Sequence, residues 1–122
     1  MCIRDRDQNA PEMRKYFHEH ARISWHNSNE CFTTAAFIRA NCEYPGAWAG
    51  EIQRVAGTEE APITVVHVYT QDRTCSFHVT SFFQISQGKI VTLDEYWGDD
   101  APPPQWRKDL GLSTPIQTGQ TG

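Results

Sequence analysis

Residues 88–97 read Gly-Lys-Ile-Val-Thr-Leu-Asp-Glu-Tyr-Trp, a stretch that predicts a β-strand with polar chemistry near its end. Successive side chains of a strand point to opposite faces of the sheet. Glu95 and Trp97 therefore share one face. Asp94 and Tyr96 share the other. Each face carries one acid and one aromatic residue, so the neighbouring strands decide which acid is enclosed.

The length and charge of the chain narrow the classes of function. With 122 residues, we expect one domain with a real hydrophobic core. The formal net charge is −4 and the chain has only 11 Lys and Arg residues. A domain that binds nucleic acid normally presents a basic surface, so we expect no nucleic-acid partner. No apolar run approaches the roughly 20 residues that span a bilayer, so we expect no membrane partner either.

Four cysteines, Cys2, Cys31, Cys42 and Cys75, lie far apart and form no C-x-x-C pair. This spacing does not favour a zinc site. No secretory signal is visible, and each cysteine has apolar neighbours, as a small buried hydrophobe would. We therefore expect reduced thiols, a cytoplasmic protein, and no metal or cofactor.

The chain divides into three parts by composition. Residues 1–9 are polar and aperiodic, which indicates a disordered or artefactual start. Residues 10–100 carry the periodic patterns of a folded domain, and 101–122 form a Pro-rich C-terminal tail in which Trp106 is expected to dock back on the domain. The patterns predict helices over 12–17 and 34–43, the second capped by Thr33, and strands over 21–27, 50–56, 63–70, 75–85 and 89–97.

Two hairpins set the expected register of the sheet. In the first, a loop over 71–74 places Thr70 opposite Cys75 and His67 opposite His78. In the second, a turn at Gln87-Gly88 places Ser86 opposite Lys89 and, counting back without interruption, Thr80 opposite Glu95. Together the two registers predict a face made of Ile63, Val65, His67, His78, Thr80, Phe82, Leu93, Glu95 and Trp97.

The opposite face of this expected sheet is also apolar. It would carry Val66, Val68, Phe77, Val79, Ser81, Phe83, Thr92, Asp94 and Tyr96. A sheet with two apolar faces needs two covers, and the sequence predicts only two modest helices. We therefore expect a homodimer that forms through one face of the sheet.

Three stretches resemble the nuclear transport factor 2-like superfamily, and among its members the SnoaL-like proteins. They are residues 16–23, where a helix passes into the first strand, residues 37–41, and residues 82–91, and the resemblance covers residues 11–100. It implies an α+β cone, in which a curved mixed sheet packs on N-terminal helices and encloses a pocket. It also implies that a longer first helix is missing from the start of the chain.

The resemblance implies a pocket that contains His78, Thr80, Glu95 and Trp97. Ketosteroid isomerases of the superfamily end their last strand in a similar Tyr-Trp, but their general base falls at Trp25 here and their oxyanion-hole acid at Thr80. Epoxide hydrolases of the superfamily have an aspartate where this chain has Glu95, but their Arg and Asp fall at His78 and Thr80. Neither catalytic set is complete.

His67, His78 and Glu95 form the strongest catalytic hypothesis. A carboxylate beside an imidazole fixes its tautomer and raises its basicity, so the group could abstract a proton or activate water. In the alternative, the three side chains form a self-satisfied polar patch. The expected ligand is a small, partly apolar molecule, and its predicted contacts are Trp25, Phe37, Thr80, Phe82, Leu93 and Trp97.

The predicted function is accordingly a cofactor-independent isomerase, cyclase or hydrolase, or else a non-catalytic ligand-binding domain of the same fold. The tripeptide His18-Glu19-His20 invites a metal interpretation, but no third ligand is indicated, so we predict no metal there.

Overall fold

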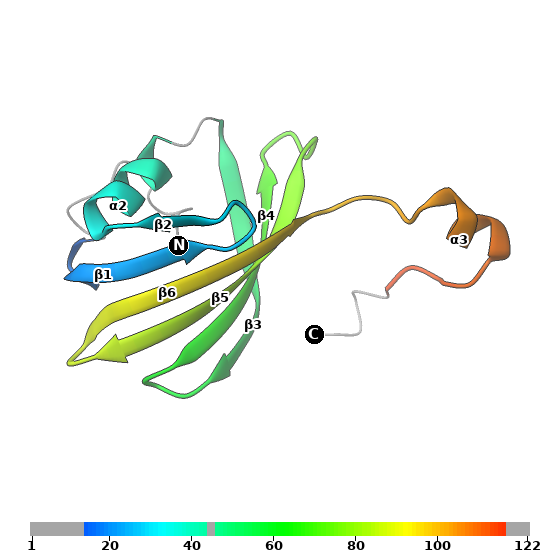
Figure 1. Ribbon diagram of the computed structural model, residues 1–122. Helices are drawn as coiled ribbons and strands as arrows, with labels where there is room; N and C mark the ends of the chain where they lie inside the picture. Colours follow the sequence, from blue (N-terminus) through cyan, green and yellow to red (C-terminus); the bar gives the residue numbers. More distant parts are fainter. Residues whose placement is uncertain (1–13, 44–45, 117–122) are drawn as a thin grey trace.

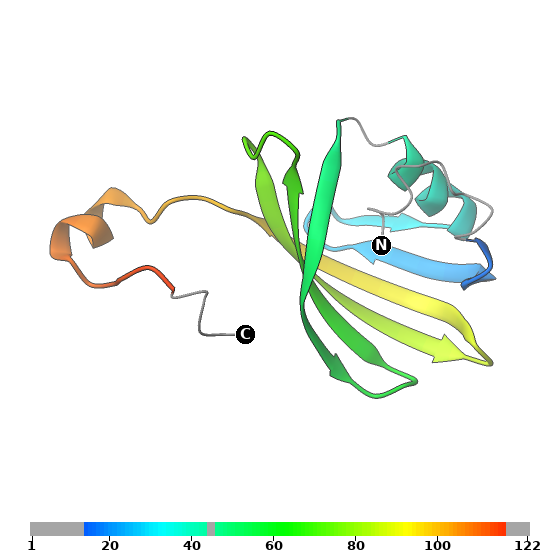
Figure 2. The same ribbon diagram turned by 180° about the vertical axis from the view of Figure 1, so that it is seen from behind.

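The computed structural model describes residues 14–43 and 46–116, and it contains one six-stranded sheet in the order β2-β1-β6-β5-β4-β3. The sheet is curved and open, and helix α2 covers the end of it that carries β1 and β2 (Figures 1 and 2). All neighbouring strands are antiparallel except β1 and β6, which are parallel. The elements are β1 Phe17–Trp25, β2 Glu30–Phe32, α2 Thr34–Cys42, β3 Trp48–Gly57, β4 Pro62–Thr70, β5 Ser76–Ser86, β6 Lys89–Asp99 and α3 Gln105–Leu110.

This architecture confirms the predicted α+β class with a curved mixed sheet. The parallel pair joins the first strand of the sheet to the last, so β6 lies in the middle of the sheet with β1 on one side and β5 on the other. Residues on β6 therefore have neighbours on both sides.

Helix α2 forms where the sequence predicts it. Thr33 is the N-cap, and its hydroxyl accepts a hydrogen bond from the backbone N–H of Ala36 at 3.2 Å. The helix buries Phe37 and Ile38 against the sheet, where they contact Ile23 and Leu93. The full core cluster consists of Phe17, Ala21, Ile23, Phe37, Ile38 and Leu93.

The start of the domain differs from the prediction. Phe17 is not the end of a helix but the first residue of β1, which begins four residues earlier than expected. Residues 12 and 13 of the predicted helix lie outside the described part of the chain, as does the predicted start over 1–9. The short strand β2 was also missed, because Asn27-Ser28-Asn29-Glu30 has loop composition.

The register of the first hairpin is confirmed: His67 lies opposite His78. The second hairpin begins as predicted, with Ser86 opposite Lys89 and Ile85 opposite Ile90. Gln84, however, lies opposite Thr92, so Val91 is an extra residue on β6. Such a bulge shifts the pairing by one residue, and a one-residue shift moves every later side chain to the other face.

The predicted grouping of side chains on the β5–β6 part of the sheet is therefore wrong. Glu95 lies opposite Ser81 and not opposite Thr80. We call the face on which α2 packs the inner face and the opposite one the outer face. From the registers, the inner face carries Ile23, Trp25, Val66, Val79, Ser81, Leu93, Glu95 and Trp97, and the outer face carries Val65, His67, His78, Thr80, Phe82, Asp94 and Tyr96.

The segment after β6 leads away from the sheet to α3 (Figure 1). Every residue of α3 is exposed, and Trp106 is 60% exposed, so the predicted docking of its indole is wrong. Residues 117–122 of the predicted tail lie outside the described residues. Within 14–43 and 46–116, no helix has the length and apolar character needed to cross a membrane.

Candidate functional site

Glu95 is a buried carboxylate on the inner face and is only 7% exposed. Its Oε1 accepts a hydrogen bond from Nε1 of Trp25 at 2.9 Å, and its Oε2 accepts one from the hydroxyl of Ser81 at 2.9 Å. Ser81 is itself 1% exposed. Each carboxylate oxygen therefore has one neutral donor, and among the described residues no cation pairs with the carboxylate.

Three strands hold this arrangement in place. Trp25 of β1 lies directly opposite Glu95 in the parallel pair, and Ser81 of β5 lies opposite it on the antiparallel side. Side chains that lie opposite each other on one face are close enough to interact. The position of the carboxylate is thus determined by the backbone register on both sides, and not by a flexible loop.

Burial controls the protonation of Glu95. Removal of the carboxylate from water raises the pKa of Glu95 above its ordinary value, because the charged form loses hydration. The hydrogen bonds from Ser81 and Trp25 act in the opposite direction but do not cancel this effect. A carboxyl group with a raised pKa is the property expected of a general acid or base that works near neutral pH.

Aromatic rings pack against Trp25, whose indole bonds the Glu95 carboxylate on the inner face. The ring of Trp25 contacts Phe32 at a centroid distance of 4.4 Å and Trp97 edge-on at 5.4 Å. Both tryptophans are half-buried, so part of each ring remains accessible. Rigid aromatic rings beside one polar group are typical of a site for a partly apolar small molecule.

A second polar cluster lies on the outer face. His67 on β4 and His78 on β5 are stacked, with ring centroids 4.5 Å apart and planes 17° from parallel. Nε2 of His67 is 3.0 Å from Oδ2 of Asp100, and Nδ1 of His78 is 2.6 Å from Oδ1 of the same carboxylate. We call these three residues the histidine cluster.

Asp100 follows β6 and is held by β5. Its backbone N–H donates to the carbonyl of Ser76 at 3.1 Å, and the hydroxyl of Ser76 donates to Oδ2 at 2.6 Å. Partial burial acts to raise the pKa of Asp100, but the hydrogen bonds from Ser76, His78 and His67 outweigh it and hold that pKa below its ordinary value.

The predicted catalytic group is therefore divided between two faces. His67 and His78 lie together, as expected, but Glu95 points to the opposite face because of the bulge at Val91. The carboxylate that contacts both histidines belongs instead to Asp100. A mechanism in which either histidine exchanges a proton directly with Glu95 does not fit this geometry.

The predicted ligand contacts are divided in the same way. Thr80 and Phe82 lie on the outer face, so they do not share a site with Glu95. Phe37 and Leu93, at 1% and 0% exposed, are core residues that present almost no surface. Trp25 and Trp97 are the two predicted contacts that lie beside Glu95 with accessible surface.

The sequence pattern did not reveal two side chains that bond to the predicted site residues, namely Ser81 and Asp100. Ser81 was assigned to the face opposite Glu95, because the uninterrupted register hid the bulge. Asp100 was not among the predicted site residues, although it lies level with Ser76 and His78. The signal that could have found Asp100 is the pair of histidines predicted to lie opposite each other, which lack an acidic partner on their own strands.

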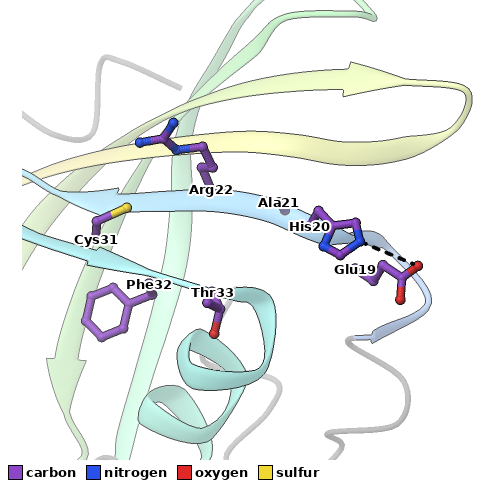
Figure 3. Close-up of a pocket in the computed structure, with 7 residues that line it drawn as sticks. All are labelled: Glu19, His20, Ala21, Arg22, Cys31, Phe32 and Thr33. Carbon is purple, nitrogen blue, oxygen red and sulfur yellow. Dashed lines mark ion pairs between the residues drawn. The ribbon is translucent and has the colours of Figure 1, made fainter.

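Two shallow depressions lie near the start of β1, away from Glu95. The first, of about 300 Å³, is lined by Glu19, His20, Ala21, Arg22, Cys31, Phe32 and Thr33 (Figure 3). In it Nε2 of His20 is 3.9 Å from the carboxylate of Glu19, and both side chains are largely exposed. The second, of about 380 Å³, is lined by Arg14, Phe17, His18, Glu19, Thr34 and Lys89. Both are open to solvent, and neither is lined by Glu95, Trp25, Ser81 or Trp97.

Comparison with solved structures identifies the fold. A candidate ketosteroid isomerase from Kribbella flavida DSM 17836 matches with a TM-score of 0.76 and 21% identity, over 92% of this chain and 82% of that one. An NTF2-like protein of unknown function from Burkholderia xenovorans LB400 matches with a TM-score of 0.70 and 17% identity, over 94% and 95% of the two chains.

A candidate SnoaL-like polyketide cyclase from Jannaschia sp. CCS1 matches with a TM-score of 0.64 and 14% identity, over 77% of this chain and 80% of that one. Comparisons with models of protein families and with curated protein sequences found no match. Since all these identities are below 25%, the likeness concerns the fold, which is that of the nuclear transport factor 2-like proteins.

Proposed function

We propose that this chain binds a small, partly apolar molecule on the inner face of its sheet, and that Glu95 acts on that molecule as an acid or base without a cofactor. The reaction class would be an isomerisation, a cyclisation or a hydrolysis. One observation carries the proposal: Glu95 is a buried carboxylate with no described cationic partner and with a pKa raised by desolvation.

The surroundings of Glu95 support this role. Ser81 and Trp25 fix both carboxylate oxygens, so the group is oriented before any ligand binds. Trp25 and Trp97 offer flat apolar surface beside it. Two of the similar structures are named as a candidate ketosteroid isomerase and a candidate polyketide cyclase. Reactions with these names move protons on carbon next to carbonyl groups.

In such a reaction, the carboxylate of Glu95 would remove a proton from the carbon beside a carbonyl. The electrons of that C–H bond would move into an enolate, and the protonated carboxyl would return the proton to another carbon. A raised pKa makes the carboxylate a stronger base for the first step, and general acid–base catalysis of this kind contributes about 10²–10⁴-fold in rate. The histidine cluster has no part in these steps.

The alternative is a non-catalytic ligand-binding domain. The observation that favours it is that both oxygens of Glu95 already accept hydrogen bonds from Trp25 and Ser81, as in a self-satisfied polar group. In this case Glu95 would orient a ligand by exchanging one of these bonds. The fold alone does not choose between the two functions.

The test uses a β,γ-unsaturated ketone as the probe, because its isomerisation to a conjugated ketone is followed by ultraviolet absorbance. We expect turnover by the wild-type chain and a loss of at least tenfold in kcat for Glu95→Gln, with the fold retained. The matched control is Asp94→Asn, since Asp94 is the adjacent acid on the outer face. Equal turnover of Glu95→Gln and the wild type would refute the catalytic role.

If the wild type does not turn the ketone over, quenching of tryptophan fluorescence by the same ketone measures binding beside Trp25 and Trp97. Saturable quenching that is weakened in Trp97→Leu would favour the non-catalytic alternative. Absence of both turnover and binding would count against an inner-face site for this class of molecule.

We also propose that the chain forms a homodimer through the outer face. Phe82 and Tyr96 are 43% and 45% exposed there, and their rings contact each other edge-on at 5.9 Å. A face with large exposed aromatic residues is favourable for association. The cytoplasm remains our proposed location, on the basis of the cysteine pattern.

A further inference from the structure

The histidine cluster brings three potential metal ligands to one point of the outer face. The ligand atoms of His67, His78 and Asp100 all lie within 4.8 Å of one another. They come from three separate segments, namely β4, β5 and the residue after β6. The stacked rings direct Nε2 of His67 and Nδ1 of His78 to the two oxygens of one carboxylate.

We propose that His67, His78 and Asp100 bind a divalent first-row transition-metal ion, with Zn²⁺ as the representative ion. Two imidazole nitrogens and one carboxylate oxygen form a donor set that suits Zn²⁺ and its neighbours, while Mg²⁺ and Ca²⁺ prefer oxygen ligands alone. Water would complete the coordination sphere, because all three side chains are only partly buried.

The distances fit this ion after small movements. Ligand atoms at about 2.0–2.2 Å from a tetrahedral Zn²⁺ lie roughly 3.4 Å from one another. The two nitrogen–oxygen separations here, each to a different oxygen of Asp100, are 3.0 and 2.6 Å, and one ligand atom from each residue lies within 4.8 Å of the others. Each separation therefore has to change by about 1.4 Å or less. Rotations of partly exposed side chains supply movements of this size, and the backbone need not change.

The backbone already holds the ligands in place. His67 and His78 are direct partners in the antiparallel pair of β4 and β5. Asp100 is fixed by its two hydrogen bonds with Ser76, and the hydroxyl of Ser76 would remain as an outer partner of the coordinating carboxylate. Glu51 lies opposite His67 on the next strand and adds negative charge on the same face. This charge favours a cation.

The same face supplies a natural comparison. His26 and Asp94 also form a histidine–carboxylate pair, with 2.8 Å between Nε2 and Oδ1. Here, however, the neighbouring ring is Tyr96, which stacks on His26 at 4.1 Å and offers no imidazole nitrogen. With one ligand fewer, this pair should bind the ion far more weakly.

The proposed ion would join β4 and β5 to the segment that leaves β6. It would therefore fasten the start of the C-terminal segment to the sheet, on the face opposite Glu95. The inference does not rest on an acid–base role for Glu95, and either one can fail without the other.

The experiment is a calorimetric titration of the full chain with ZnCl₂, after chelator treatment and without an affinity tag. We expect one ion per chain in the wild type. His78→Gln and Asp100→Asn should each weaken the binding at least tenfold. His26→Gln, the matched control, should leave it unchanged. Circular dichroism reports whether each variant is folded.

Three outcomes would overturn the proposal: no Zn²⁺ binding in the wild type, equal binding in wild type, His78→Gln and Asp100→Asn, or loss of binding in His26→Gln alone.

A second measurement needs no variant, and it keeps the proposal testable if one of the variants does not fold. Zn²⁺ should shift the imidazole ¹H–¹⁵N resonances of His67 and His78 but not those of His18 and His20. Shifts confined to the latter pair would place the ion elsewhere and refute the site.

Discussion

Trp25 and Glu95 are direct partners across the parallel pair of β1 and β6, and the indole Nε1 of Trp25 donates a hydrogen bond to the Glu95 carboxylate at 2.9 Å. The bond joins the first strand of the sheet to a strand formed about seventy residues later. It is charge-assisted whenever Glu95 is ionised, and such bonds are stronger than bonds between neutral groups. The relationship makes Glu95 part of the structure as well as a candidate functional group.

The first prediction concerns the effect of pH on stability. Because the folded-state pKa of Glu95 is raised above its ordinary value of 4.5, the folded state holds its proton more tightly than the unfolded state. The free energy of unfolding contributed by Glu95 is therefore highest below about pH 4.5 and falls as the pH rises through the raised pKa. Glu95→Gln removes this loss and should be more stable than the wild type above that pKa, but similar to it below pH 4.5.

Urea unfolding of the wild type and Glu95→Gln at several pH values measures this difference. The matched control is Glu59→Gln, because Glu59 is exposed in the turn between β3 and β4. Its difference from the wild type should stay near zero at every pH. A constant difference between Glu95→Gln and the wild type across the range would contradict the prediction.

The second prediction concerns the hydroxyl of Ser81. Ser81→Ala leaves Oε2 of Glu95 buried without its donor, and removing the partner of a buried polar group costs about 1–3 kcal/mol. We expect a decrease of this size in the free energy of unfolding at a pH above the raised pKa of Glu95. The decrease should be smaller in acid, where Glu95 is neutral. Ser86→Ala, at the exposed end of β5, is the control and should change stability by less than about 0.5 kcal/mol. An equal effect of both substitutions would be inconsistent with the bond to Glu95.

The third prediction tests the core beneath α2. Leu93 is fully buried among Phe37, Ile38 and Ile23, so Leu93→Ala should create a cavity and lower the free energy of unfolding by about 2–5 kcal/mol. Leu110→Ala is the same substitution on the exposed helix α3 and should cost less than about 0.5 kcal/mol. Chemical denaturation of the two variants measures both values. A small effect of Leu93→Ala would mean that residue 93 is not in the core.

Local patterns in the sequence predicted much of the fold. Thr33 marked the start of α2, and the turn signals around Gln87-Gly88 correctly paired Ser86 with Lys89. These features depend on a few neighbouring residues. The predicted strands followed from the same kind of local evidence, whereas the mixed sheet was implied by the resemblance to the nuclear transport factor 2-like superfamily.

The candidate site was harder to predict because it depends on the bulge at Val91. At this point β6 is irregular against β5, and its pairing with β1 also shifts, between Phe17–Ile90 and Arg22–Thr92. Val91 is a normal β-branched strand residue, so nothing in its local sequence indicates an extra residue. The irregularity involves three strands, because β6 shifts its register against both β5 and β1 near Val91. Because of this one extra residue, Glu95 lies opposite Ser81 and not opposite Thr80, as the uninterrupted register predicted.

The last prediction concerns the outer face. If the chain forms a homodimer there, light scattering after size-exclusion chromatography at micromolar concentration should give twice the mass of the 13.9 kDa chain. Phe82→Asp introduces a charge among the aromatic residues of this face and should give a monomer that remains folded, because Phe82 is 43% exposed. The control is Ile52→Asp, which charges an exposed apolar residue whose partner, Val66, lies on the inner face. This control should stay dimeric. A monomeric wild type would refute the dimer, and a monomer produced by Ile52→Asp but not by Phe82→Asp would assign the interface to the inner face, where it would compete with a ligand for the surface beside Glu95.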